Sequence, residues 1–167
     1  MSANEQFGRR VFRDPAYFVA AGFGSGLAPK APGTAGTVVG VILYVLLLAS
    51  LPLWVYIAVV AGALLLGVVV SHRVTRQLGV EDHQGIVWDE VVGVWVTLAF
   101  MHPVSSWVWL VAAFLLFRVF DILKPWPIRT LDQRVKGGLG VMLDDVLAGV
   151  YAGVALLIAL AVSSKFI

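Results

Sequence analysis

The chain contains a run of about 41 positions, Ala31–Ser71, without a single charged residue, and no other feature constrains its fold so strongly. A helix that crosses a lipid bilayer needs about 20 apolar residues, so this run has room for two such helices, joined near Pro52. Charged residues make up only 13% of the sequence, against about 25% in soluble domains. The sequence therefore predicts an all-α, polytopic membrane helix bundle, with residues 1–167 forming one membrane-embedded domain.

Two further apolar runs follow. Val146–Ser164 predicts one more crossing helix. Val91–Phe117 is interrupted by a turn around Pro103, and each half has only about 11 residues, or about 16 Å of helix. Because the hydrocarbon core is about 30 Å thick, a spanning hairpin requires helices that extend out to about Ile86 and Leu123. The alternative is a short re-entrant pair. With the hairpin, we expect about five transmembrane helices.

Lysine and arginine are distributed unevenly between the two sides of the predicted bundle. Arg9, Arg10 and Arg13 precede the first span, and the loops on the same side carry further basic residues at positions 73, 76, 124, 129, 134 and 136. Lys165 is alone on the opposite side. The positive-inside rule then places the N-terminus in the cytoplasm. We expect residues 1–14 to be a flexible cytoplasmic segment and the glycine-rich residues 16–29 to form an interfacial or half-inserted helix.

Two pairs of adjacent carboxylates flank the predicted spans: Asp89 with Glu90, and Asp144 with Asp145. Both pairs are expected on the cytoplasmic side, each at the mouth of a helix. A charge held within a membrane costs at least about 2.5–3.5 kcal/mol, so such residues need a partner or a function. Hard divalent cations prefer carboxylate oxygens, which makes these four residues candidate metal ligands and catalytic groups, with Asp121 as a further ligand. The alternative role is capping of helix N-termini, where acidic side chains are favourable.

Small residues predict how these helices pack. Asp145, Gly149 and Gly153 recur at every fourth position and share one helix face, which a neighbouring helix can approach closely. Gly93, one turn into the preceding acidic helix, allows the same approach. The glycines within residues 137–140 indicate a flexible loop before the second acidic pair. The face that packs inward is therefore predicted to carry Asp145, and the glycine faces leave both packing within the chain and dimerisation open.

Basic side chains on the same side predict a phosphorylated substrate. Arg118, Asp121 and Lys124 recur at every third position, close to one helix face. Arg118 can grip a phosphate with two N–H groups, and Lys124 can act as a point charge. An internal salt bridge with Asp121, or contact with lipid headgroups, would explain the same residues. Arg129 is a further candidate cation.

The segment Pro29–Thr37 is a second candidate phosphate site. A helix that begins here presents free backbone N–H groups, with Lys30 and the Thr34 hydroxyl beside them. Thr34 can also be a plain N-cap of that helix. His83, seven positions before Glu90, is a candidate proton relay, because imidazole titrates near neutral pH.

Taken together, five blocks in this order resemble the phosphatidylglycerophosphatase A family. They are Gly22–Leu27, Pro32–Gly36, Ile86–Glu90, Phe117–Ile128 and Gly137–Gly149. The resemblance implies a Mg²⁺-dependent lipid phosphatase of the bacterial inner membrane, which removes the terminal phosphate of phosphatidylglycerophosphate to give phosphatidylglycerol. It also implies that the acidic blocks carry metal binding and catalysis.

We therefore expect Mg²⁺ at the cytoplasmic face, held by Asp89, Glu90, Asp144 and Asp145. Either a water molecule or one aspartate attacks the phosphorus. The phosphate is held by the candidate binding residues Lys30, Thr34, Arg118, Lys124 and Arg129. The expected partners are the phospholipid and the membrane, with no nucleic acid. The rival hypothesis is a small ion-coupled transporter, because intramembrane acids also serve as proton or Na⁺ relays; acids gathered on one face favour the enzyme.

Overall fold

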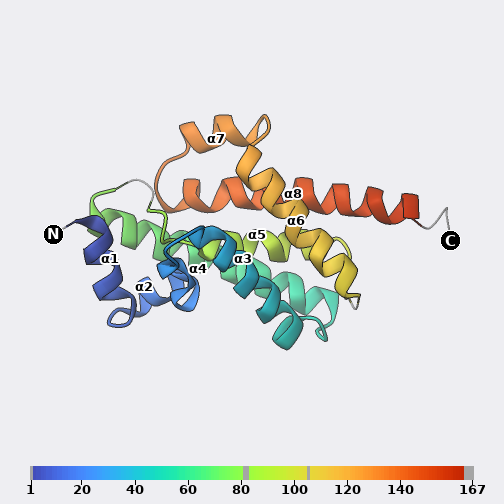
Figure 1. Cartoon of the computed structure of the whole chain (residues 1–167), viewed down its shortest axis with the longest axis horizontal. Helices are drawn as coiled ribbons and strands as arrows, with labels where there is room; N and C mark the ends of the chain where they lie inside the picture. Colours follow the sequence, from blue (N-terminus) through green and yellow to red (C-terminus); the bar gives the residue numbers. More distant parts are fainter. Residues whose placement is uncertain (1, 81–82, 105, 164–167) are drawn as a thin grey trace.

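The computed structural model describes residues 2–80, 83–104 and 106–163, and no strand occurs among them, which confirms the predicted all-α class. Figure 1 shows an elongated bundle in which the first helix and the end of the last helix lie far apart along the long axis. The α-helices are α1 (Ala3–Val11), α2 (Pro15–Ala20), α3 (Pro32–Leu43), α4 (Leu53–Leu78), α5 (Trp88–Ala99), α6 (Trp107–Leu123), α7 (Ile128–Arg134) and α8 (Gly137–Ser163). Two further segments are the 3-10 turns of η1 (Gly22–Leu27) and the π segment η2 (Tyr44–Leu48), which continues α3.

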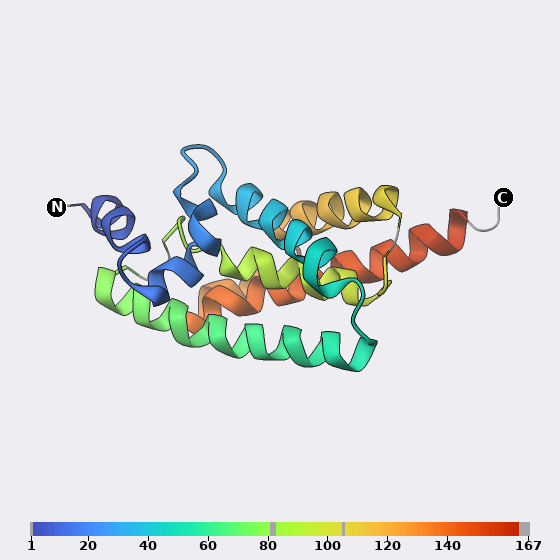
Figure 2. The ribbon, with the colours of Figure 1, turned by 90° about the horizontal axis from the view of Figure 1, so that it is seen from below.

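Helix α5 lies at the centre of the bundle and contacts α3, α4, α6 and α8 (Figure 2). Its apolar side chains are buried around most of its circumference, as expected for a helix without a solvent face. Two indole N–H groups tie it to its neighbours. Trp88 donates to the carbonyl of Ala63 on α4 at 2.9 Å, and Trp95 donates to that of Gly40 on α3 at 2.8 Å. The position of α5 is therefore fixed from several sides.

Glycine makes the contact between α5 and α8 unusually close. A Cβ atom at Gly93 would lie 2.9 Å from the carbonyl oxygen of Asp145, and one at Gly149 would lie 2.5 Å from the carbonyl oxygen of Gly93. Gly153 is packed in the same way against the ring of Phe100. The predicted small-residue face is confirmed, and it packs within the chain.

Helix α8 begins earlier than the sequence predicted. Residues 137–140 were expected to form a flexible loop, but they are the first turn of α8. A Cβ atom at Gly138 would collide with the carbonyl oxygen of Val68 on α4, so glycine serves close helix packing here rather than flexibility. As a result, Asp144 and Asp145 lie two turns inside α8 and not at its mouth.

The N-terminal segment is also ordered differently from the prediction. Residues 1–14 were expected to be flexible, but Ala3–Val11 form helix α1. The side chain of Ser2 accepts from the backbone N–H of Glu5, and the Glu5 side chain accepts from that of Ser2, which forms a capping box. Phe7 and Val11, one turn apart, are buried in a cluster that includes α2 and α4. The burial of Phe7 and Val11 supplies the tertiary contact that a short helix needs.

Two of the described helices, α4 and α8, are long and apolar enough to cross a membrane. The apolar stretch of α3 and η2 ends at Leu48, α5 has 12 residues and α6 has 17, so the expected five spanning helices are not confirmed. Helix α6 ends at Leu123, as predicted. Lys165, which entered the prediction of orientation, lies outside the described residues.

Helix α5 begins at Trp88 rather than at the predicted Ile86. Val87 donates its backbone N–H to the carbonyl of Ala20 at 2.8 Å, and this bond to α2 holds the preceding chain out of helical geometry. Twelve residues make about 18 Å of helix. Over this length α5 contacts α3, α4, α6 and α8.

We predict that Gly149→Leu lowers the free energy of unfolding by about 1–3 kcal/mol, because the added side chain forces α5 and α8 apart. Unfolding in mixed detergent micelles, followed by circular dichroism, measures the change. Gly62→Leu in α4 is the matched control, since no atom lies within 4 Å of a Cβ at Gly62. Equal destabilisation of the two variants would contradict the close packing described above.

Candidate functional site

A polar cavity of about 360 Å³ opens at one end of the bundle, where α3, α5 and α8 have their N-terminal parts and α6 has its C-terminal end. Five carboxylates and two cations line it, together with Gln84 and the start of α3. The charged lining residues are Asp89, Glu90, Arg118, Asp121, Lys124, Asp144 and Asp145. Both predicted acidic pairs thus reach the same cavity, although they come from separate helices.

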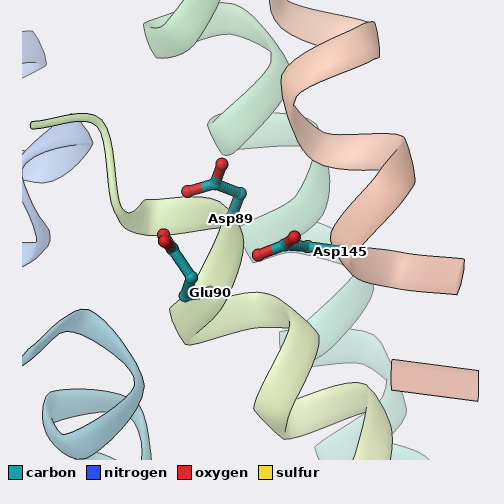
Figure 3. A group of neighbouring side chains, drawn as sticks. All are labelled: Asp89, Glu90 and Asp145. Carbon is teal, nitrogen blue, oxygen red and sulfur yellow. The ribbon is translucent and has the colours of Figure 1, made fainter. Parts of the chain in front are cut away.

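Three of these carboxylates form one cluster, which Figure 3 shows between α5 and α8. Asp89, Glu90 and Asp145 each offer an oxygen that lies within 4.8 Å of the other two. Asp89 and Glu90 lie in the first turn of α5, where the backbone N–H groups favour negative charge. Asp145 is buried at 3% exposure on the α8 face that packs against α5.

The cluster has the donor set that a hard metal ion requires. One buried oxygen of each member, Asp89 Oδ1, Glu90 Oε2 and Asp145 Oδ2, has no hydrogen-bond partner among the described residues. Buried carboxylates without partners are costly, and a divalent cation among them offsets that cost. The residues present therefore fit a divalent metal ion.

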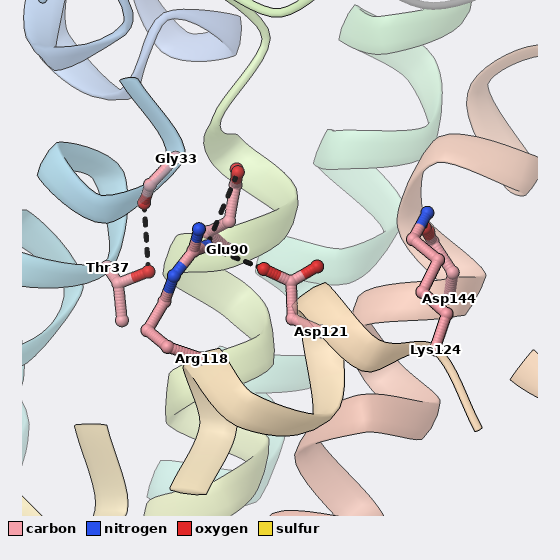
Figure 4. A network of polar contacts seen from close by, with 7 residues as sticks. All are labelled: Gly33, Thr37, Glu90, Arg118, Asp121, Lys124 and Asp144. Atoms are coloured by element: carbon pink, nitrogen blue, oxygen red, sulfur yellow. Dashed lines mark hydrogen bonds and ion pairs between the residues drawn. The ribbon is translucent and has the colours of Figure 1, made fainter. Parts of the chain in front are cut away.

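Asp144 is adjacent to Asp145 but has a different partner. Its Oδ2 accepts from Lys124 Nζ at 2.5 Å (Figure 4). Lys124 also pairs with Asp132 of α7 at 3.2 Å. Burial lowers the pKa of Lys124, but the hydrogen bond and charge of Asp144 outweigh burial, so the net pKa is raised and the side chain stays protonated. Lys124 follows the last turn of α6 with a φ of 41°, a left-handed conformation uncommon for a residue with a side chain.

Arg118 lies on the opposite side of the cavity, next to α3. Its Nη1 donates to Asp121 Oδ2 at 2.6 Å and lies 3.9 Å from Glu90 Oε1 (Figure 4). The buried Nε has no partner among the described residues. A Cβ atom at Gly33 would collide with Glu90 Oε1 and lie 3.2 Å from Arg118 Nη1, so a side chain at this point of α3 would displace the Glu90 carboxylate. Asp121 thus orients Arg118 and stands outside the three-carboxylate cluster.

Four residues that the sequence analysis proposed do not line this cavity. Lys30 is exposed, directly before the lining residue Ala31, and Arg129 is exposed on α7. Thr34 is the third residue of α3, so the structure contradicts the alternative that it is the N-cap, a position that Ala31 occupies. His83 is buried, and its ring stacks on that of Phe7 with the ring centroids 4.4 Å apart. It lines a neighbouring cavity beside α1.

The structure adds residues that the sequence analysis did not select. Gln84 lines the main cavity. A second cavity of about 230 Å³ shares Asp89 and Asp144 with the first and is lined by Asp132 and Gln133 of α7. Nothing in the local sequence places α7 beside the acidic cluster. The position of α7 follows from its packing against α8 and from the ion pair of Asp132 with Lys124.

The chain was also compared with known proteins. A family model described as phosphatidylglycerophosphatase A matches residues 18–160. A phosphatidylglycerophosphatase A from Haemophilus influenzae Rd is 47% identical over 152 residues, which cover 91% of this chain and 93% of that protein. A phosphatidylglycerophosphatase A from Escherichia coli K12 is 43% identical over 142 residues, which cover 85% of this chain and 81% of that protein.

A third relative carries a different name. This Bacteroides thetaiotaomicron protein, provisionally named a phosphatidylinositol-3-phosphatase, is 42% identical over 146 residues, which cover 84% of this chain and 91% of that protein. No solved structure matches the chain. The family model covers most of the chain and includes every residue of the carboxylate cluster. The chain therefore belongs to the phosphatidylglycerophosphatase A family.

Proposed function

We propose that this protein is a Mg²⁺-dependent lipid phosphatase that hydrolyses phosphatidylglycerophosphate to phosphatidylglycerol and inorganic phosphate. The observation that supports it best is the cluster of Asp89, Glu90 and Asp145 beside two cations in one cavity. The names of the two family relatives support the substrate. A phosphomonoester needs both features, because its charge must be neutralised while water replaces the alcohol.

The three clustered carboxylates are the proposed metal ligands, and Asp144 and Asp121 lie beside them. When bound, Mg²⁺ would supply charge neutralisation at the phosphate and polarise the attacking oxygen. Asp144 Oδ2 accepts from Lys124 and Asp121 Oδ2 accepts from Arg118, while Asp144 Oδ1 is buried without a hydrogen-bond partner among the described residues. We therefore assign Asp144 and Asp121 the role of orienting the two cations.

The two cations are the proposed phosphate ligands. Arg118 presents a planar fork that matches two phosphate oxygens, and its Nε is not engaged by any described residue. Lys124 stays protonated and stands beside the cluster as a second positive charge. In the net reaction the bond between phosphorus and the glycerol oxygen breaks, water oxygen joins the phosphorus, and a proton goes to the leaving alcohol. The two cations would counter the charge that develops during this exchange.

The membrane placement belongs to the same proposal. We infer a multi-pass protein of the bacterial inner membrane with α3–η2, α4, α5, α6 and α8 as its five membrane segments. Helices α4 and α8 have the length and apolarity for this, and the short α5 is shielded by the others. The positive-inside rule puts the N-terminus and the active site on the cytoplasmic side. The rival transporter gains no support, because the acids gather at one end of the bundle and the relatives are named as phosphatases.

We predict that the purified protein in detergent micelles releases phosphate faster from phosphatidylglycerophosphate than from phosphatidylinositol 3-phosphate. Phosphate release with Mg²⁺ present measures both rates. Because one relative is named for the inositol lipid, this comparison discriminates between the two substrates. A higher kcat/KM for the inositol lipid would reassign the substrate, and no release from either lipid would remove the phosphatase function.

We predict that Asp145→Asn lowers kcat/KM for the lipid by about 100-fold or more, because a metal ligand is lost while the shape of the side chain is kept. The unfolding midpoint of the variant checks that the fold is intact. Asp14→Asn is the matched control, since Asp14 pairs with Arg73 at 2.8 Å and does not line the cavity. Wild-type activity in Asp145→Asn would rule out the assigned role.

We predict that EDTA abolishes phosphate release and that added Mg²⁺ restores it. A binding readout without turnover accompanies this test. Mg²⁺ should raise the thermal unfolding midpoint of the wild-type protein, because a ligand that binds only the folded state stabilises it. The same addition should leave the midpoint of Asp145→Asn nearly unchanged. Activity that persists in EDTA would contradict the metal requirement.

A further inference from the structure

An apolar groove of about 200 Å³ lies between α3 and α6, away from the acidic cavity. Its walls are aliphatic and aromatic: Val38, Val41 and Ile42 from α3, and Leu110, Val111 and Phe114 from α6. Three of these side chains, Val38, Ile42 and Val111, are between 42% and 50% exposed, so the groove is open to the surroundings. Figures 1 and 2 show the two helices side by side, in agreement with their contacts.

The groove and the acidic cavity share the same two walls. Gly33 of α3 and Arg118 of α6 line the cavity. At about 1.5 Å per residue, the groove residues lie about 8–14 Å from Gly33 along α3 and about 6–12 Å from Arg118 along α6. The same two helices thus line the charged cavity at the end of the bundle and the apolar groove on its side.

A charged cavity followed by an apolar groove matches the two parts of a phospholipid whose phosphate lies in the cavity. We propose that the α3–α6 groove binds an acyl chain of the lipid substrate, an inference that rests on the proposed phosphatase function. No charged residue occurs on α3, or on α6 before Arg118, so nothing in the groove needs water. An acyl chain that leaves the headgroup between Gly33 and Arg118 meets this groove first. The groove therefore contributes binding energy that is specific to the lipid form of the substrate.

The test compares two substrates in two groove variants. The substrates are the long-chain lipid phosphatidylglycerophosphate and its acyl-free headgroup, glycerophosphoglycerophosphate. Ile42→Trp and Val111→Trp fill the groove from its opposite walls, and because both side chains are about half exposed, the larger ring fits without entering the core. We expect kcat/KM for the long-chain lipid to fall about tenfold, the loss that corresponds to about two methylene groups no longer buried. We expect kcat/KM for the headgroup to stay unchanged.

Leu65→Trp is the matched control, because Leu65 is an exposed apolar residue on α4, away from the groove. It should leave the ratio of the two kcat/KM values unchanged. An unchanged ratio in both groove variants would overturn the acyl-chain site while the phosphatase function stands. Hydrolysis of neither substrate by the wild-type protein would overturn both. If one groove variant fails to fold, the other tests the same site from the opposite helix.

Discussion

The close packing of α5 against α8 is the contact on which the rest of this structure depends. Gly93 and Gly149 remove the side chains that would hold the two helices apart, so each lies against the backbone of the other helix. This brings the first turn of α5 next to the third turn of α8. Asp89 and Glu90 then meet Asp145, although more than fifty residues separate them in the chain. A wider helix pair would separate Asp145 from Asp89 and Glu90.

Charge balance explains how the site is divided. Arg118 pairs most closely with Asp121 and also lies 3.9 Å from Glu90 of the cluster, whereas Lys124 pairs with Asp144 and Asp132. The cluster itself keeps buried oxygens without protein partners. Buried carboxylate oxygens without partners destabilise the folded protein, and a bound divalent cation would remove that destabilisation. The residues that pair with the cations and the residues suited to a metal therefore overlap at Glu90.

The position of the site suits a substrate with two chemically different parts. All charged groups of the cavity lie at one end of the bundle, while the α3–α6 surface beyond them is apolar. A phosphorylated headgroup and a hydrocarbon chain require these two environments at a fixed separation. Because α3 and α6 contribute to both environments, these two helices set that separation.

The sequence by itself determined the properties that depend on neighbours along the chain. Uncharged runs predicted helices, and the spacing of Asp145, Gly149 and Gly153 predicted an inward face. Other features were decided only by the tertiary structure, because they depend on partners distant in sequence. Gly138 is helical since its contact is Val68 on α4, and α1 is held by the cluster that includes Val74. Asp144 and Asp145 have different partners because those partners are also distant in sequence. Adjacent residues on a helix point about 100° apart, and only the packed fold places Lys124 before one and the carboxylate cluster before the other.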